Sequence, residues 1–81
     1  MRPEDILQIL RTRPFRPFRL SVSDGTSYDV RHPELALVGR SVVIVGVPGP
    51  EGPEGPMERF VHCALIHITR TELIDGARTA G

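Results

Sequence analysis

The spacing of apolar residues predicts one helix at the start of the chain. Residues 3–13 begin with Pro3, which suits a first helical turn because its missing N–H would be unpaired there. The apolar residues that follow recur at helical spacing: Ile6, Leu7, Ile9 and Leu10. Pro14 is expected to end the helix, since the residue before a proline avoids helical backbone angles. A helix this short needs an apolar surface to lie on.

From Phe18 onward, apolar and polar residues alternate, as in strands with one buried face. Asp24-Gly25 is a strong signal for a tight hairpin turn. The returning strand runs from Thr26 to about Arg31, and we expect its apolar residues to share a face with those of the first strand. Pro33 ends it, because proline cannot donate to a ladder.

Residues 35–45 leave two alternatives open. Leu35–Val38 and Val42–Val45 are either two short strands joined by a tight turn, or one long strand kinked at Gly39. The run Val42–Val45 is apolar on both faces, which favours a central position in a sheet.

Residues 46–57 form four consecutive Gly-X-Y triplets, the period of a collagen triple helix. Four triplets between strands favour an extended, mobile loop instead. Residues 59–73 are too long for one ordinary strand, so we expect a bend near Ala64-Leu65-Ile66 that gives two short strands. The tail, residues 76–81, is expected to be frayed.

Together these elements predict a single domain over residues 1–81, mostly β, with an N-terminal helix. Five to six strands in so short a chain favour a strongly bent antiparallel sheet or partial barrel. The length of 81 residues, 40% apolar and 25% charged, fits one small globular domain. The sequence has no run of 18 apolar residues, so we expect no membrane span. It has one cysteine, Cys63, which fits a cytoplasmic protein.

All ten basic residues are arginine, and the formal net charge is zero. Arginine makes bidentate contacts to phosphate and carboxylate, but codon bias in a GC-rich genome produces the same composition and is the favoured explanation. Residues 1–19 have a net charge of +3, from five arginines and two acids, whereas residues 46–58 carry three acids and no base. Such a dipole suits RNA binding, head-to-tail packing of two copies, or an ordinary solvated surface.

No motif indicates catalysis, a metal or a cofactor. His62 and His67 fall on opposite sides of a regular strand, and a strand separates Cys63 from His67 beyond hydrogen-bond reach. His32-Pro33-Glu34 has no nucleophile near it in the sequence and is expected to be a strand-ending turn. We therefore expect a protein that is not an enzyme, with no cofactor, no metal site and no small-molecule substrate.

Three segments resemble a group of short bacterial proteins without an assigned activity. Their pattern is PFxPFxxxxxDG, then VxHPE, then ITxxE, and it is matched here by residues 14–25, 30–34 and 68–72. This resemblance implies no particular chemistry.

The order of elements is also similar to that of the Sm-like fold, the small barrel of bacterial RNA chaperones, with an SH3-like barrel as the related form. Those proteins have an N-terminal helix, a first hairpin with a glycine turn, bent strands, and a last pair of short strands split by a tight turn. Val22-Ser23-Asp24-Gly25 stands at the first hairpin, and residues 60–69 resemble the closing pair. The lysine-bearing RNA-contact motif of the chaperones is absent, so the resemblance implies a small barrel and a ring but transfers no RNA-binding residue.

The sequence thus predicts a small interaction or assembly module that forms a homo-oligomer by pairing exposed strand edges. The alternative is an RNA or single-stranded DNA binder, with candidate contacts at Arg11, Arg13, Arg16 and Arg19. In the competing structural interpretation of this segment, Phe15 and Phe18 anchor the helix-to-strand crossing in the core and the arginines face solvent. A third alternative is an enzyme with a site between subunits, for which no residue is indicated.

Overall fold

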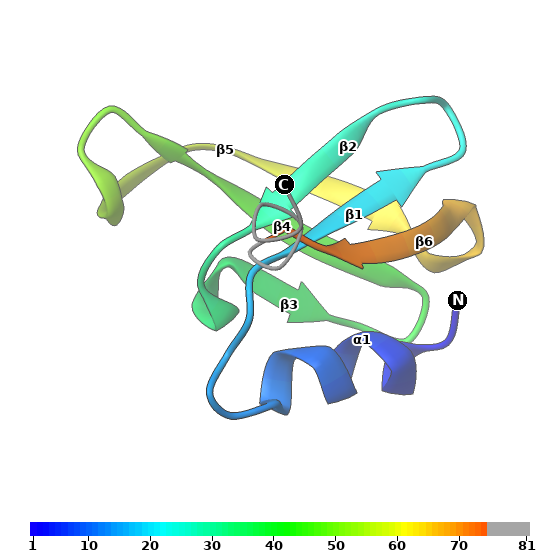
Figure 1. The fold of residues 1–81 in the computed structure, drawn as a ribbon. Coiled ribbons are helices and arrows are strands. Elements are labelled where there is room, and N and C mark those ends of the chain that lie inside the picture. Colours follow the sequence, from blue (N-terminus) through cyan, green and yellow to red (C-terminus); the bar gives the residue numbers. More distant parts are fainter. Residues whose placement is uncertain (75–81) are drawn as a thin grey trace.

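The computed structural model describes residues 1–74, which form one helix and six strands (Figure 1). The predicted mostly-β chain with an N-terminal helix is confirmed. The frayed tail predicted for residues 76–81 lies outside the described residues. The elements are α1 (Pro3–Arg11), β1 (Phe18–Val22), β2 (Ser27–Val30), β3 (Ala36–Val38), β4 (Val42–Gly49), β5 (Gly52–Ala64) and β6 (Ile68–Leu73).

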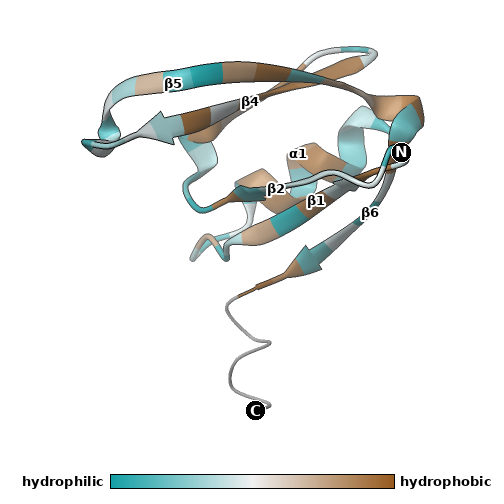
Figure 2. Cartoon of the chain, turned by 90° about the horizontal axis from the view of Figure 1, so that it is seen from above, coloured by the Kyte–Doolittle hydropathy of each residue, from teal (hydrophilic) through white to brown (hydrophobic). Residues whose placement is uncertain are grey.

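The strands form two antiparallel sheets of three strands each, in the orders β2-β1-β6 and β3-β4-β5. A 3₁₀ turn at Pro33–Leu35 carries the chain from β2 to β3, and a second at Leu65–His67 carries it from β5 to β6. Figure 2 shows the long β4–β5 ribbon on one side of the molecule and β1, β2, β6 and α1 on the other. Neither sheet is closed, and the strands that the sequence predicts to form one bent sheet or partial barrel lie in two small sheets over a shared core.

Helix α1 ends at Arg11, two residues earlier than the sequence predicts. The Asp5 carboxylate accepts a hydrogen bond from the Arg2 backbone N–H (3.0 Å) at the first turn. At the other end, the Thr12 hydroxyl donates to the Gln8 carbonyl (2.8 Å), and the Arg13 guanidinium donates to the Leu10 carbonyl (2.8 Å). These bonds satisfy carbonyls that a longer helix would have paired, and they place a cation at the negative end of the dipole.

The first hairpin follows the sequence prediction. Leu20 pairs with Tyr28 and Phe18 pairs with Val30, so the apolar residues of both strands share one face. Gly25 has a φ of 94°, which a residue with a Cβ rarely adopts, and its N–H donates to the Val22 carbonyl (2.9 Å). The glycine is therefore what allows the chain to reverse within four residues.

Residues 35–45 form a hairpin and not one kinked strand. The Gly39 N–H donates to the Val42 carbonyl (2.7 Å), and β3 pairs with β4 from Ala36↔Val45 to Val38↔Val43. The predicted third strand starts one residue late, because Leu35 belongs to the 3₁₀ turn that Pro33 begins. Strand β4 lies at the centre of its sheet, as the two-sided apolar run predicts.

The loop predicted for residues 46–57 is instead mostly paired strand. Strand β4 continues to Gly49 and β5 starts at Gly52, so the Gly-X-Y triplets form the outer half of a long hairpin that projects from the body of the fold (Figure 1). The pairing is irregular around Pro48. Prolines hold φ near extended values, and the φ of 88° at Gly52 turns the chain. The composition that favours a loop therefore also suits an irregular ribbon.

The bend predicted near Ala64-Leu65-Ile66 is confirmed as the 3₁₀ turn Leu65–His67. The strand before it is not short, since β5 has 13 residues and extends back through the Gly-X-Y segment. The Leu65 N–H donates to the Ser41 carbonyl (2.9 Å), and the Ser23 N–H donates to the His67 carbonyl (2.8 Å). These two bonds tie the turn to both sheets.

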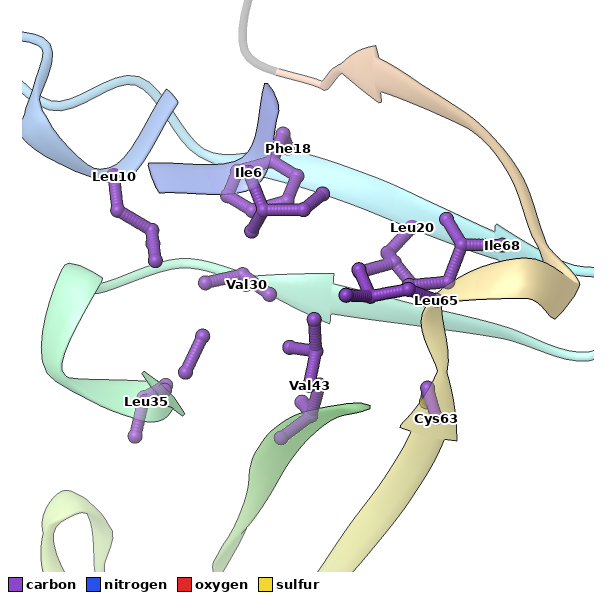
Figure 3. Close-up of a cluster of buried hydrophobic side chains, with 12 residues drawn as sticks. Ile6, Leu10, Phe18, Leu20, Val30, Leu35, Val43, Cys63, Leu65 and Ile68 are labelled. Carbon is purple, nitrogen blue, oxygen red and sulfur yellow. The ribbon is translucent and has the colours of Figure 1, made fainter. Parts of the chain in front are cut away.

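The core lies between the two sheets and α1 (Figure 3). Phe18, Leu20 and Val30 from one sheet face Val43 from the other, and Ile6 and Leu10 fill the side next to α1. Phe18 is 1% exposed, and Phe15 packs against it edge to face with ring centroids 6.2 Å apart. The structural interpretation of these two aromatics is therefore confirmed, and a stacking role for Phe18 is ruled out.

Candidate functional site

The four arginines proposed as partner contacts lie on different segments. Arg11 is exposed in the last turn of α1. Arg13 donates to the carbonyls of Leu10 (2.8 Å) and Thr12 (3.0 Å), so its guanidinium completes the end of the helix. Arg16 is exposed in the segment that leads to β1. Arg11 lines a depression formed by residues in and just after its own helix, whereas Arg19 lines a larger pocket together with residues far away in the sequence.

This pocket, of about 620 Å³, opens between β2 and the outer part of the β4–β5 hairpin. It exists because the chain bends away at Pro33–Leu35, which leaves β2 with β1 as its sole strand partner among the described residues. Its polar wall is formed by residues in and just after β1 and β2, namely Arg19, Tyr28, Asp29, Arg31 and His32, and Arg59 lines the pocket from β5, where it pairs with Val47. Its apolar wall includes Leu35, Val45, Val47, Pro48 and Pro53.

An ion-pair network orders the charged wall of the pocket. The Arg19 Nε lies 2.8 Å from the Asp29 Oδ1, and the Arg31 Nη2 lies 3.3 Å from the Asp29 Oδ2. The hydrogen bond from Arg19 and the positive charge of both arginines lower the pKa of Asp29, although partial burial opposes this change. The same hydrogen bond and the charge of Asp29 raise the pKa of Arg19. One carboxylate thus holds two guanidinium groups at the rim.

Arg59 has no acidic partner within the described part of the chain, and its side chain is exposed beside the pocket. His32 lines the pocket from the end of β2, in the turn that the sequence assigns to the end of the strand. Sequence reasoning missed this constellation, because Arg19, Arg31 and Arg59 are brought together by the packing of two separate sheets. The bend at His32-Pro33 was the one local signal that a gap would open there.

A second group of polar residues lies where β5 turns into β6. The Ser23 hydroxyl is 3.4 Å from the His67 Nδ1, and Asp24 accepts hydrogen bonds from the Thr26 hydroxyl (2.7 Å) and N–H (3.0 Å). Those bonds lower the pKa of Asp24. Cys63 lines the same depression but is 4% exposed, and burial, with the charge of Asp24, raises its pKa. This thiol is therefore poorly suited to act as a nucleophile.

The outer edges of β5 and β6 carry backbone groups without a strand partner in the described structure. The Leu65 N–H donates to the Ser41 carbonyl, and the alternation of an antiparallel ladder then turns the N–H and C=O of Phe60, His62 and Ala64 away from β4.

The same alternation applies to β6. The Ile74 N–H donates to the Pro17 carbonyl (3.1 Å), which turns the backbone groups of Thr71 and Leu73 away from β1. Both sheets therefore end in a strand that can accept another.

Large apolar side chains are exposed near these edges. Phe60 on β5 is 63% exposed, Ile66 in the turn between β5 and β6 is 83% exposed, and Leu73 on β6 is 44% exposed. Leu37 on β3 is 66% exposed on the outer face of the second sheet. Exposed apolar groups around a free edge are typical of interaction surfaces.

Comparison with protein-family models, with curated proteins and with solved structures gives no match to this chain. Over residues 1–74, no helix has the length and apolar character needed to cross a bilayer. In the same range, no group of three or more His, Cys, Asp or Glu side chains is placed to hold a metal ion.

Proposed function

We propose that the protein is a non-enzymatic assembly module of the Sm-like small-barrel type, whose copies join by pairing the β5 edge of one with the β6 edge of the next. Each sheet has two edge strands, and the observation that carries this proposal is the unlike pair β5 and β6, which carry the exposed apolar side chains of Phe60 and Leu73. A contact between two different surfaces is heterologous, so it repeats from copy to copy and gives a ring or a filament.

The order of elements supports the Sm-like part of the proposal. The chain has the N-terminal helix, a first hairpin with Gly25 in its turn, a bend between β2 and β3, and a tight turn between its last two strands. The exposed apolar side chains support the assembly part, because Phe60 and Leu73 lie on the two strands that would meet. Burying them would add to the backbone hydrogen bonds of the new ladder.

Nucleic-acid binding is a weaker candidate. Arg13 and Arg19 are engaged in hydrogen bonds within the chain, and the buried Phe18 offers no face for a base. A stacking platform over the Arg/Phe segment would need both groups to be available.

Proline substitutions test the proposal, since proline removes one backbone donor. His62→Pro blocks the β5 edge and Thr71→Pro blocks the β6 edge, and in each case the lost N–H points away from the strand's own partner. We expect light scattering to give a multiple of the chain mass for the unmodified protein and the monomer mass for each variant. His62→Thr and Thr71→Val keep the N–H and serve as matched controls that assemble normally.

An equimolar mixture of the two proline variants gives a sharper result. Each retains the edge that the other has lost, so one contact forms and cannot propagate, and we expect a dimer. Circular dichroism establishes that both variants are folded. A strict monomer at every concentration of the unmodified protein contradicts the proposal, as does a mixture that stays monomeric.

A further inference from the structure

The pocket between β2 and β4 has no role in edge pairing, and its composition suits a ligand. We propose that it binds a small organic anion, a molecule that carries a phosphate or carboxylate group on an apolar or aromatic body. The argument rests on the charge, the available donors and the shape of the pocket.

The pocket carries an excess of positive charge in a protein of zero net charge. Three guanidinium groups, those of Arg19, Arg31 and Arg59, line it against the single carboxylate of Asp29. Among the lining residues the guanidinium groups therefore exceed the carboxylates by two, although the charge of Glu72, outside the lining, also acts on Arg19. Guanidinium groups present paired donors that match the oxygens of phosphate and carboxylate, so an oxyanion is the complementary ligand.

The three guanidinium groups differ in how many of their N–H donors are already hydrogen-bonded within the protein. Arg19 and Arg31 both bond to Asp29, which holds their side chains in place before any ligand arrives. Each guanidinium has five N–H donors, so donors remain after these bonds are made. Arg59 bonds to no acid within residues 1–74, and an incoming anion would provide its counter-charge.

Backbone N–H groups supply further hydrogen-bond donors to the pocket. The Val22 N–H donates to the Thr26 carbonyl (2.9 Å), and the alternation of the β1–β2 ladder then turns the N–H of Ser27 and of Asp29 away from β1. Both residues line the pocket, along the edge of β2 that has no strand partner in the described structure. Neutral N–H donors at a fixed edge can complete the coordination of an oxyanion.

The apolar residues of the pocket lining explain why the ligand needs an apolar body. Leu35, Val45 and Pro48 contribute apolar side chains to the lining, and Tyr28 adds an aromatic ring. A volume of about 620 Å³ exceeds the size of an inorganic oxyanion. It falls within the range of about 300–1,000 Å³ that is usual for small-molecule sites.

Titration of the ¹⁵N-labelled full chain with phenyl phosphate, followed by amide chemical shifts, tests this inference. We expect saturable shifts at Tyr28, Arg31 and Arg59, and smaller shifts with inorganic phosphate. Benzoate in place of phenyl phosphate distinguishes a carboxylate ligand from a phosphate ligand. Benzyl alcohol keeps the ring without the charge and is expected to bind weakly or not at all.

Arg59→Gln removes the guanidinium that lacks an acidic partner, and we expect it to weaken phenyl phosphate binding about tenfold. Arg59→Lys keeps the charge without the paired donors and is expected to restore part of the affinity. Arg40→Gln, at an exposed arginine of the β3–β4 turn outside the pocket, is the matched control and should bind normally.

The inference is overturned if phenyl phosphate causes no saturable shifts at millimolar concentration, or if the shifts lie elsewhere in the molecule. It is also overturned if benzyl alcohol binds as well as phenyl phosphate, or if Arg40→Gln weakens binding as much as Arg59→Gln. Thr71→Pro, which leaves the pocket intact, should bind phenyl phosphate normally, so the outcome is independent of assembly.

Discussion

Arg19 and Asp29 face each other across the β1–β2 ladder and are joined by two hydrogen bonds, Nε–Oδ1 at 2.8 Å and Nη2–Oδ2 at 3.5 Å. They are direct cross-strand partners, so the pair links the register of the first hairpin to the rim of the pocket. The side chains are 43% and 32% exposed, which limits what the pair contributes to stability.

Asp29→Asn is expected to make stability less dependent on pH. The folded protein lowers the pKa of Asp29, so its stabilising contribution is complete above the unfolded carboxyl pKa of about 3.9 and is lost as the pH falls through the lower folded value. Urea denaturation should show the variant less stable by up to about 1 kcal/mol at neutral pH. The gap should close in acid, and a gap that stays constant with pH would contradict this account.

Ile6→Ala should show that α1 is part of the core. Ile6 is fully buried against the sheets, and removing such a side chain costs about 2–5 kcal/mol. Gln8→Ala, at an exposed position of the same helix, is the control and should change the unfolding midpoint little. Equal midpoints for the two variants in urea, followed by circular dichroism, would mean that the helix does not pack as described.

Gly25→Ala should destabilise the first hairpin. At a φ of 94° a Cβ is strained, although no atom lies near enough to clash with it, so the cost is conformational and of about 1–2 kcal/mol. Ser27→Ala, at an exposed position next to the same turn, should be nearly neutral. Thermal unfolding of the two variants compares them directly, and an unchanged melting temperature for Gly25→Ala would refute the assigned turn.

Cys63 should react slowly with a thiol reagent while the protein is folded. Burial covers the sulfur and raises its pKa, so both access and thiolate content are low at neutral pH. Reaction with a chromogenic disulfide should accelerate when urea unfolds the chain. A native reaction as fast as that of the unfolded chain would show that Cys63 is not buried in the core.

Local patterns predict most of the fold. Alternation places Phe18, Leu20 and Val30 in the core, and the Asp24-Gly25 turn fixes their pairing. The Gly-X-Y segment could not be predicted, because glycine and proline indicate a loop by composition while the ladder there depends on a partner strand.

The pocket is beyond sequence reasoning for a different reason. Arg19 lies on β1, Arg31 follows β2 and Arg59 lies on β5, and the packing of the two sheets with the bend after β2 brings all three to the lining of one pocket. Of the arginines selected from the sequence, Arg13 instead completes a helix end, an assignment that requires knowing where the helix stops.

The prolines of the β4–β5 hairpin limit the length over which a strand of a neighbouring chain can pair with it. Pro48, Pro50, Pro53 and Pro56 have no N–H to offer, so continuous docking along the whole ribbon is broken at its outer half. The stretch from Phe60 to Ala64 keeps its donors. A long exposed edge strand can pair with further copies and grow into fibres. In this hairpin the prolines confine such pairing to one short stretch of β5.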